Sequence, residues 1–425
     1  MNTTPQSENS LQHVLFGSLI GTTIEFFDFY IYANAAVLVF PQLFFPGTDK
    51  TTSVLQSLAT FSIAFFARPI GSAVFGHYGD KIGRKTTLVV ALLTMGFSTV
   101  CIGFLPSYAS VGIIAPILLM MCRFGQGVGL GGEWGGAVLL AIENAPAHKR
   151  AWFGMFPQLG APIGLLLSGG TFLILTNSLN PEDFMGYGWR IPFIASSLLV
   201  LVGFYIRLKI TETTAFENAK QEQKEVKIPF VTLLKSYRKE LLFGTFAAVT
   251  TFVVFYLMTV FMLNWNTKEL KFSNKEALLM QLFSVLFFAA FIPISAVIAD
   301  KIGRRKMLIY ASLAIAIFGL FFSAFLNSGS TILVTFFLCL GMALMGFTYG
   351  PIGTFLSELF PTTVRYSGAS LTFNLAGIIG AAFAPMIAIW IAANYGLTFV
   401  GYYLSAAALI SVISLLVISK KEHQF

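Results

Sequence analysis

Five ionisable side chains lie inside long apolar stretches of the sequence: Glu25, Asp28, Arg68, Arg123 and Glu133. A carboxylate can take up and release a proton, whereas an arginine keeps its proton and binds a carboxylate through two parallel hydrogen bonds. A charge at the centre of a membrane costs about 3 kcal/mol on insertion scales, so each such residue indicates a functional site. Together they predict a buried site that transfers protons and binds an anionic group.

The balance of charge within this set points to the residues that transfer the proton. The set contains three acids and two arginines, so one acid has no cation to pair with. A carboxylate left without a partner in a low-dielectric site takes up a proton. We assign proton coupling to Asp28 and Glu133 first and to Glu25 next. Depth along the helices favours Asp28 over Glu133 as the partner of Arg123. The alternative is that these residues are buried pairs that only specify helix packing.

The two arginines are the candidate anchors for a substrate carboxylate, because a guanidinium matches a carboxylate in a bidentate pair. Pro69 follows Arg68 and weakens the helix there. Neutral contacts to a substrate are expected from polar and aromatic residues of both halves of the chain, each of which has helix packing as its alternative role. These candidates are Tyr32, Gln126, Gln158, Tyr256, Tyr349 and Asn374.

Composition places these residues in a membrane protein. Of the 425 residues, 56% are hydrophobic and 11% are charged, whereas a soluble protein carries about 25% charged residues. Apolar stretches of about 20 residues are long enough to cross the hydrocarbon core of a bilayer. Such stretches occur at roughly 14–40, 54–78, 87–105, 112–142, 151–176, 189–208, 241–263, 277–299, 307–326, 331–357, 366–393 and 398–418. We therefore predict an all-α membrane protein with twelve transmembrane helices.

Two charged motifs occur twice in the chain and in the same order. The stretch Gly76–Lys85 reads GHYGDKIGRK and returns at 296–306 as AVIADKIGRRK, while the pattern E-x-x-P-x-x-x-R occurs at 143–150 and 358–365. The repetition predicts two homologous six-helix halves in parallel orientation, 1–208 and 241–425, joined by the polar cytoplasmic linker 209–240. Such halves are expected to rock about a central site.

The repeated motifs lie at expected helix ends, where ion pairs can hold one conformation and must break in the other. The glycines of 76–85 are expected to allow a tight loop between two helices, and the acids to pair with arginines or helix N-termini. The alternative is a basic loop that only sets topology. The candidate latch residues are Gly76, Asp80, Gly83, Arg84, Glu143, Arg150, Asp300, Arg304, Glu358 and Arg365.

The motif G-x-x-x-D-K-x-G-R-K between the second and third helices, with its echo between the eighth and ninth, resembles the signature of the major facilitator superfamily. Three further stretches, 25–29, 66–71 and 123–133, resemble the metabolite:proton symporter family. That family includes carriers for citrate, 2-oxoglutarate, shikimate, and proline or betaine. The resemblance implies secondary transport by alternating access.

Most of the 27 Lys and Arg residues fall in segments on one side of the membrane, which predicts that both termini are cytoplasmic. This bias accounts for the net charge of +8 without a nucleic-acid partner. The four histidines form no cluster that would bind a metal, and we find no motif for a nucleotide or for catalysis. The expected location is the bacterial cytoplasmic (inner) membrane.

We therefore expect a proton-coupled symporter of a small organic metabolite, with a carboxylate as the favoured substrate class. Its expected partners are the substrate, protons and membrane lipid, with no cofactor, and the expected state is a monomer. A proton-independent facilitator or an antiporter of the same fold remains an alternative. A non-transporting membrane receptor is a remote one.

Overall fold

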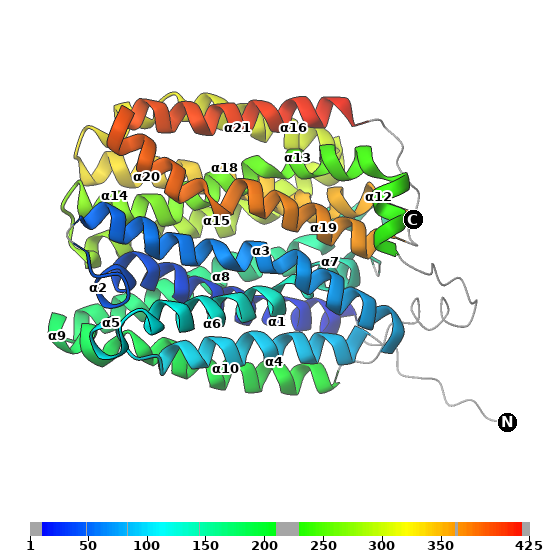
Figure 1. The fold of residues 1–425 in the computed structure, drawn as a ribbon. Helices are drawn as coiled ribbons and strands as arrows, with labels where there is room; N and C mark the ends of the chain where they lie inside the picture. The colour runs from blue at the N-terminus through cyan, green and yellow to red at the C-terminus, as the bar shows by residue number, and fades with distance from the viewer. Residues whose placement is uncertain are drawn as a thin grey trace.

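The computed structural model describes residues 11–418 except 48, 83, 144, 210–228 and 362–363. Side chains are described for the same residues apart from 11–14, 76–88, 206–209 and 229–232. Within these ranges every regular element is a helix, and the long helices lie side by side (Figure 1). The prediction of an all-α protein is confirmed.

Six expected spans of the N-terminal half are present as helices. They are α1 (Leu11–Leu38), α3 (Lys50–Ile82), α4 (Arg84–Gly103), α6 (Ile114–Gly131) with α7 (Trp134–Glu143), α8 (Arg150–Ser178) and α10 (Arg190–Lys209). Short helices join some of them: α2 (Phe40–Leu43), α5 (Tyr108–Val111), η1 (Ala147–Lys149), α9 (Pro181–Asp183) and η2 (Phe184–Gly188).

The C-terminal half supplies the other six spans. They are α13 (Arg238–Tyr256) with η3 (Leu257–Phe261) and α14 (Met262–Lys268), α15 (Asn274–Ile302), α16 (Arg304–Gly319) with α17 (Phe322–Leu326), α18 (Thr331–Glu358), α19 (Arg365–Gly377) with η4 (Ile378–Ala382) and α20 (Ala384–Tyr395), and α21 (Leu397–Val417). By length and composition alone, eight described spans are apolar enough to cross a membrane, or nine with one bent pair.

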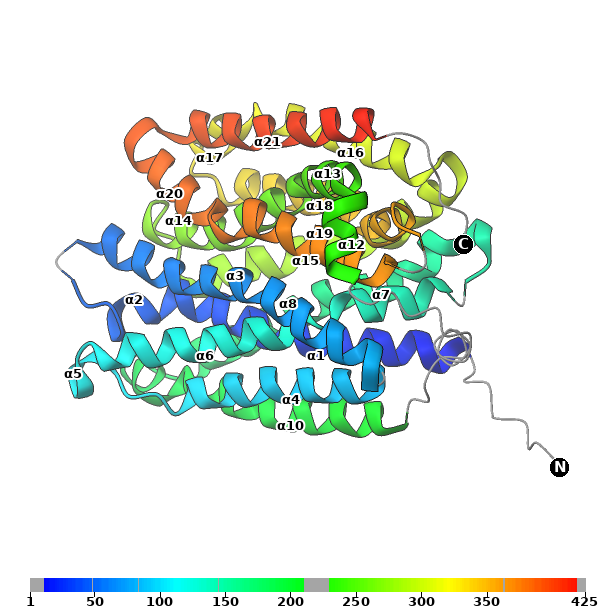
Figure 2. The same ribbon diagram turned by 45° about the vertical axis from the view of Figure 1, so that its right-hand side comes forward.

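The two halves lie against each other along their length. Figure 1 shows α1, α4, α6 and α10 on one side and α13, α16, α18 and α21 on the other, and the rotated view in Figure 2 shows the same separation. Close packing between the halves runs chiefly through α8 against α15 and through α3 against α19. Large apolar side chains such as Phe97 and Ile332 are exposed on the outside, as expected for a surface that faces lipid.

Two sequence expectations need correction. The stretch 76–85 was expected to be a loop, but α3 continues through it to Ile82 and α4 begins at Arg84. The expected helix 112–142 is interrupted between Gly131 and Trp134, where successive glycines weaken the helix. Within the predicted linker 209–240, the described residues include a helix, α12 (Pro229–Ser236), beside α19.

Candidate functional site

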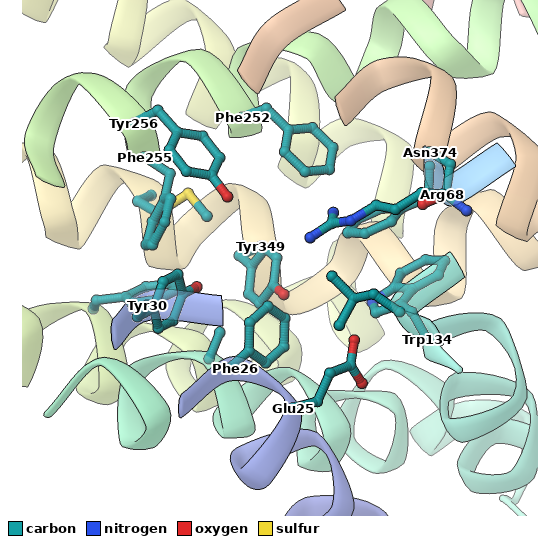
Figure 3. A pocket seen from close by; sticks show the side chains of 15 residues that line it. Glu25, Phe26, Tyr30, Arg68, Trp134, Phe252, Phe255, Tyr256, Tyr349 and Asn374 are labelled. Carbon is teal, nitrogen blue, oxygen red and sulfur yellow. The ribbon is translucent and has the colours of Figure 1, made fainter. Parts of the chain in front are cut away.

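A small cavity of about 30 Å³ lies between the two halves, deep in the helix bundle (Figure 3). Its lining combines one cation and one acid with many aromatic rings, from α1, α3, α6, α7 and α8 on one side and α13, α15, α18 and α19 on the other. The lining residues are Glu25, Phe26, Tyr30, Arg68, Leu130, Trp134, Ala161, Phe252, Phe255, Tyr256, Phe288, Met345, Tyr349, Phe373 and Asn374. In this conformation the volume suits a water molecule or two.

Arg68 and Glu25 supply the charged groups of this cavity, and Figure 3 shows both pointing into it. Both side chains are buried, at 5% and 2% exposure. The Arg68 guanidinium lies over the rings of Phe29 and Phe65, at 4.7 and 4.6 Å from their centroids. These cation–π contacts orient the guanidinium without neutralising its charge.

Glycines place the backbone that carries Arg68. A Cβ on Gly131 of α6 would overlap the backbone carbonyl of Arg68, and a Cβ on Gly127 would overlap that of Ala64. Helices α3 and α6 approach this closely only because these positions lack a side chain. The sequence pattern of small residues spaced by four therefore fixes where Arg68 enters the cavity.

Arg123 does not line the cavity. It is fully buried beside α1 and α3, stacks over Phe29, Tyr32 and Phe61 at 4.1–4.7 Å, and donates from Nη1 to Gln126 Oε1 at 2.9 Å. Arg68 and Arg123 thus both contact the ring of Phe29, but only Arg68 lines the cavity. They do not converge on one space as a pair of substrate anchors would.

A chain of polar side chains leads from Arg123 to Asp28. Gln126 Nε2 donates to Thr99 Oγ1 at 2.8 Å, and Thr99 lies beside Asp28. Ser196 on α10 donates to Asp28 Oδ1 at 2.5 Å, while Asp28 Oδ2 is buried without a hydrogen-bond partner. The expected pairing of Arg123 with Asp28 is therefore indirect.

The neutral candidates divide between the cavity and its surroundings. Tyr256, Tyr349 and Asn374 line the cavity. Tyr32 lies under Arg123, its hydroxyl 2.6 Å from Thr60 Oγ1. Sequence reasoning had no signal to separate these two groups, because the separation depends on which helix face meets the other half.

Gln158 and Asn374 connect the halves. Gln158 on α8 accepts from Trp134 Nε1 at 3.0 Å and donates to the Tyr349 carbonyl on α18 at 2.9 Å. Asn374 on α19 donates to Ser72 Oγ on α3 at 2.7 Å. These bonds, made beside the cavity, depend on the present arrangement of the halves.

Glu133 lies at the interruption between α6 and α7 and is buried at 2% exposure. The neighbouring Gly132 carbonyl accepts from Tyr366 Oη on α19 at 2.6 Å. Trp134, the next residue, stacks on Phe373 of α19 with centroids 3.6 Å apart and planes 5° apart. Sequence reasoning missed Trp134 and Phe373; the only signal was the position of Trp134 directly after a buried acid.

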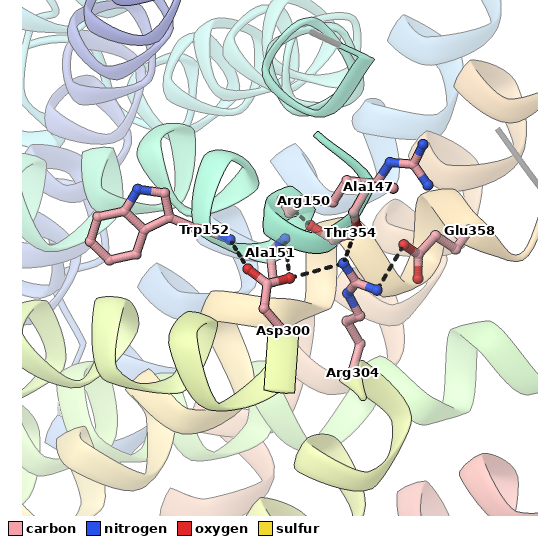
Figure 4. A network of polar contacts seen from close by, with 8 residues as sticks. All are labelled: Ala147, Arg150, Ala151, Trp152, Asp300, Arg304, Thr354 and Glu358. Atoms are coloured by element: carbon pink, nitrogen blue, oxygen red, sulfur yellow. Dashed lines mark hydrogen bonds and ion pairs between the residues drawn. The ribbon is translucent and has the colours of Figure 1, made fainter. Parts of the chain in front are cut away.

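At the bundle end expected to face the cytoplasm, Asp300 and Arg304 form a polar cluster (Figure 4). Asp300 accepts from the backbone N–H groups of Ala151 and Trp152, both at 3.0 Å, and from Arg304 at 2.9 Å. Arg304 also pairs with Glu358 at 3.5 Å. The geometry joins α15 and α16 of one half to the N-terminus of α8 in the other.

The remaining latch candidates are distributed around this cluster. The Arg150 carbonyl accepts from Thr354 Oγ1 at 3.3 Å, and Arg365 is buried with Nε donating to the Phe360 carbonyl at 3.1 Å. Glu143 is the last residue of α7 and lies shortly before Arg150 in the chain. For the first motif copy, Gly83 lies outside the described residues, as do the side chains of Gly76, Asp80 and Arg84.

Metal binding is not indicated: in the part of the chain that the structure describes, no group of three or more His, Cys, Asp or Glu side chains is placed to hold an ion.

The comparison with known families decides the class of protein. The profile described as Major Facilitator Superfamily matches residues 18–379. The chain belongs to the major facilitator superfamily.

Relatives within the superfamily are transporters. The inner membrane metabolite transport protein YhjE of Escherichia coli (strain K12) is 54% identical, covering 98% of this chain and 96% of that protein. The shikimate transporter of the same strain is 33% identical over 96% and 94% of the two chains. The proline/betaine transporter of Salmonella typhimurium (strain LT2) is 33% identical over 96% and 83%. The resemblance to carriers of the metabolite:proton symporter type is confirmed.

The fold also matches a solved member of the superfamily. The E. coli xylose transporter XylE, in a partially occluded inward-open conformation, aligns with a TM-score of 0.75 at 18% identity over 98% of this chain and 99% of that one. This likeness confirms the predicted all-α major facilitator fold. The protein is therefore a multi-pass transporter of the inner membrane and not an enzyme.

Proposed function

We propose that this major facilitator protein is a proton-coupled symporter of a small organic metabolite that carries a carboxylate group. The observation that carries the proposal is the placement of buried Arg68 and Glu25 in one cavity between the halves. A cation and a titratable acid in the same water-poor space can bind an anion and a proton together. The names of the relatives support a metabolite as the substrate.

Arg68 anchors the carboxylate in this account. Its guanidinium points into the cavity and its face rests on Phe29 and Phe65, which leaves its N–H edge to form a bidentate pair. Tyr256, Tyr349 and Asn374 supply neutral contacts from the opposite half. Arg123, Tyr32, Gln126 and Gln158 support the site from outside its lining.

Asp28 and Glu133 are the first candidates for the transported proton, followed by Glu25, the acid of the central cavity. Asp28 is fully buried, no described cation contacts it, and one of its oxygens has no hydrogen-bond partner. An isolated buried charge costs several kcal/mol, so this carboxylate carries a proton in the present conformation. Release of that proton requires a conformation in which water or Arg123 approaches.

The latch proposal assigns the repeated motifs to alternating access. The Asp300 cluster closes the cytoplasmic end, while the other end is closed by hydrogen bonds from Ser62 to the Ala382 carbonyl and from Lys275 to Asn177. Both ends therefore carry hydrogen bonds between the halves in this conformation. Rocking of residues 1–208 against 241–425 breaks one set of contacts at a time, in a monomer surrounded by lipid with both termini in the cytoplasm.

Uptake by purified protein in liposomes tests this proposal. Shikimate, L-proline and betaine, the compounds named for the relatives, are offered with an inwardly directed proton gradient. Accumulation of one of them that a protonophore abolishes is the expected result. Equilibration of the compound that does not depend on the proton gradient would instead indicate a facilitator. Accumulation driven by an outwardly directed proton gradient would indicate an antiporter.

A further inference from the structure

A second, smaller cavity of about 10 Å³ adjoins the central one. Tyr30 and Tyr256 line both cavities and so form the wall between them. The other polar side chains of the small cavity are Asn34, Thr259 and Gln281. They come from α1, η3 and α15, so both halves contribute.

Gln281 has a buried amide oxygen without a hydrogen-bond partner. Its side chain is 5% exposed and its Oε1 atom has no hydrogen-bond partner. A buried acceptor in this state costs about 1–3 kcal/mol and is rare in folded proteins. The two neighbours each donate one hydrogen bond: Thr259 donates to the Phe255 carbonyl of its own helical segment at 2.8 Å, and Asn34 donates to Ser168 Oγ on α8 at 2.9 Å. Each retains an oxygen that can accept from a ligand.

The small cavity lies on the side of the central cavity away from the Asp300 cluster. Gln281 belongs to the first turns of α15, which begins at Asn274, whereas Asp300 is near its other end. Thr259 lies in the π-helical segment η3, and such segments occur frequently at functional sites. In the proposed orientation, a path from the central cavity to the outside passes Tyr30 and Tyr256 and then Gln281.

We infer that Asn34, Thr259 and Gln281 form an outer binding site for a hydroxyl or ammonium group of the transported metabolite. The metabolite meets this site first, and separation of Tyr30 from Tyr256 then joins the site to the central cavity. The inference rests on the proposed transport function. In the present conformation the site has room for about one water molecule.

Transport kinetics measured from each side test the inference. Gln281→Leu removes the amide at nearly constant volume, and Ser284→Ala, one turn along α15, is the matched control because its hydroxyl bonds only to the Gln281 carbonyl of its own helix. Uptake of shikimate and L-proline, which carry O–H or N–H donors, is measured in right-side-out and inside-out vesicles. We expect Gln281→Leu to raise KM from the outer side about 2- to 10-fold, the equivalent of one hydrogen bond.

The same variant should leave the inner-side KM and the melting temperature unchanged, and Ser284→Ala should match the wild type on both sides. An unchanged outer KM would overturn the inference. So would an equal rise on both sides, because Gln281 would then act on the central site or on stability.

Chemical labelling tests the site independently of transport. In a chain with Cys101, Cys122 and Cys339 replaced by alanine, Gln281→Cys should react with a membrane-impermeant cationic thiosulfonate from the outer side, faster than Ser284→Cys. Absence of reaction at Gln281→Cys would overturn the outer site. Labelling without uptake of shikimate, L-proline or betaine would retain the outer site and count against the proposed symport.

Discussion

The carboxylate of Asp300, near the end of α15, accepts a 3.0 Å hydrogen bond from the backbone N–H of Ala151, in the first turn of α8. The first N–H groups of a helix have no partner within the helix and carry the positive end of its dipole, so they bind anions. Here the anion belongs to the other half of the protein. Gly303 follows the last residue of α15, and its φ of +97° lets the chain turn there into α16.

Asp300→Asn should weaken the closed cytoplasmic end. An amide oxygen cannot reproduce the charge-assisted bonds to α8 and Arg304, which together contribute about 1–3 kcal/mol. We expect spin labels on cysteines placed at the exposed positions Lys149 and Lys301 to show a longer or broader distance distribution. Asp183→Asn on α9, at the opposite end, is the control and should leave the distances unchanged. Identical distance distributions for the wild type, Asp300→Asn and Asp183→Asn would refute the latch.

Gly131→Ala should disturb the helix contact that positions Arg68. The added methyl group overlaps the Arg68 carbonyl, and overpacking of this kind costs about 1–3 kcal/mol. We expect a lower melting temperature and reduced uptake. Gly170→Ala on α8, where a Cβ meets nothing within 4 Å, should be neutral or slightly stabilising. If both variants melt alike, the close contact between α3 and α6 does not position Arg68.

Arg68→Lys and Arg123→Lys should have different consequences. Arg68 faces the cavity, so loss of its bidentate edge should raise KM about tenfold or more with little change in melting temperature. Arg123 stacks on three rings and bonds to Gln126, so lysine there should mainly lower the melting temperature. Uptake kinetics and thermal unfolding of both variants measure this contrast. The reverse pattern would place the anchor at Arg123.

The sequence was sufficient to predict the fold, because each apolar stretch is long enough to cross a bilayer and the repeated motifs expose the two halves. It also identified the five buried charges that lie within apolar stretches, since a charge in such a stretch is visible without a structure. For Asp80 of the first motif copy, the sequence predicted a hydrogen bond from a helix N-terminus or from an arginine, and Asp300, the equivalent acid of the second copy, accepts both.

The arrangement of the site was not predictable in the same way. Arg68 and Arg123 look equivalent in the sequence, yet only Arg68 reaches the cavity, because helix rotation decides which face meets the other half. The stacking of Trp134 on Phe373 joins residues far apart in the chain, and no periodicity marks such a pair. The helical continuation of α3 through the charged stretch was missed because glycines usually indicate a turn.

The most direct test of the central claim is proton movement during transport. Liposomes that contain the purified protein and an internal pH dye receive shikimate, L-proline or betaine outside, with no imposed proton gradient. We predict internal acidification with the transported compound, and none with Asp28→Asn, although that variant still exchanges labelled for unlabelled substrate because the amide oxygen keeps the Ser196 hydrogen bond. Substrate uptake by the wild type without acidification would contradict proton-coupled symport.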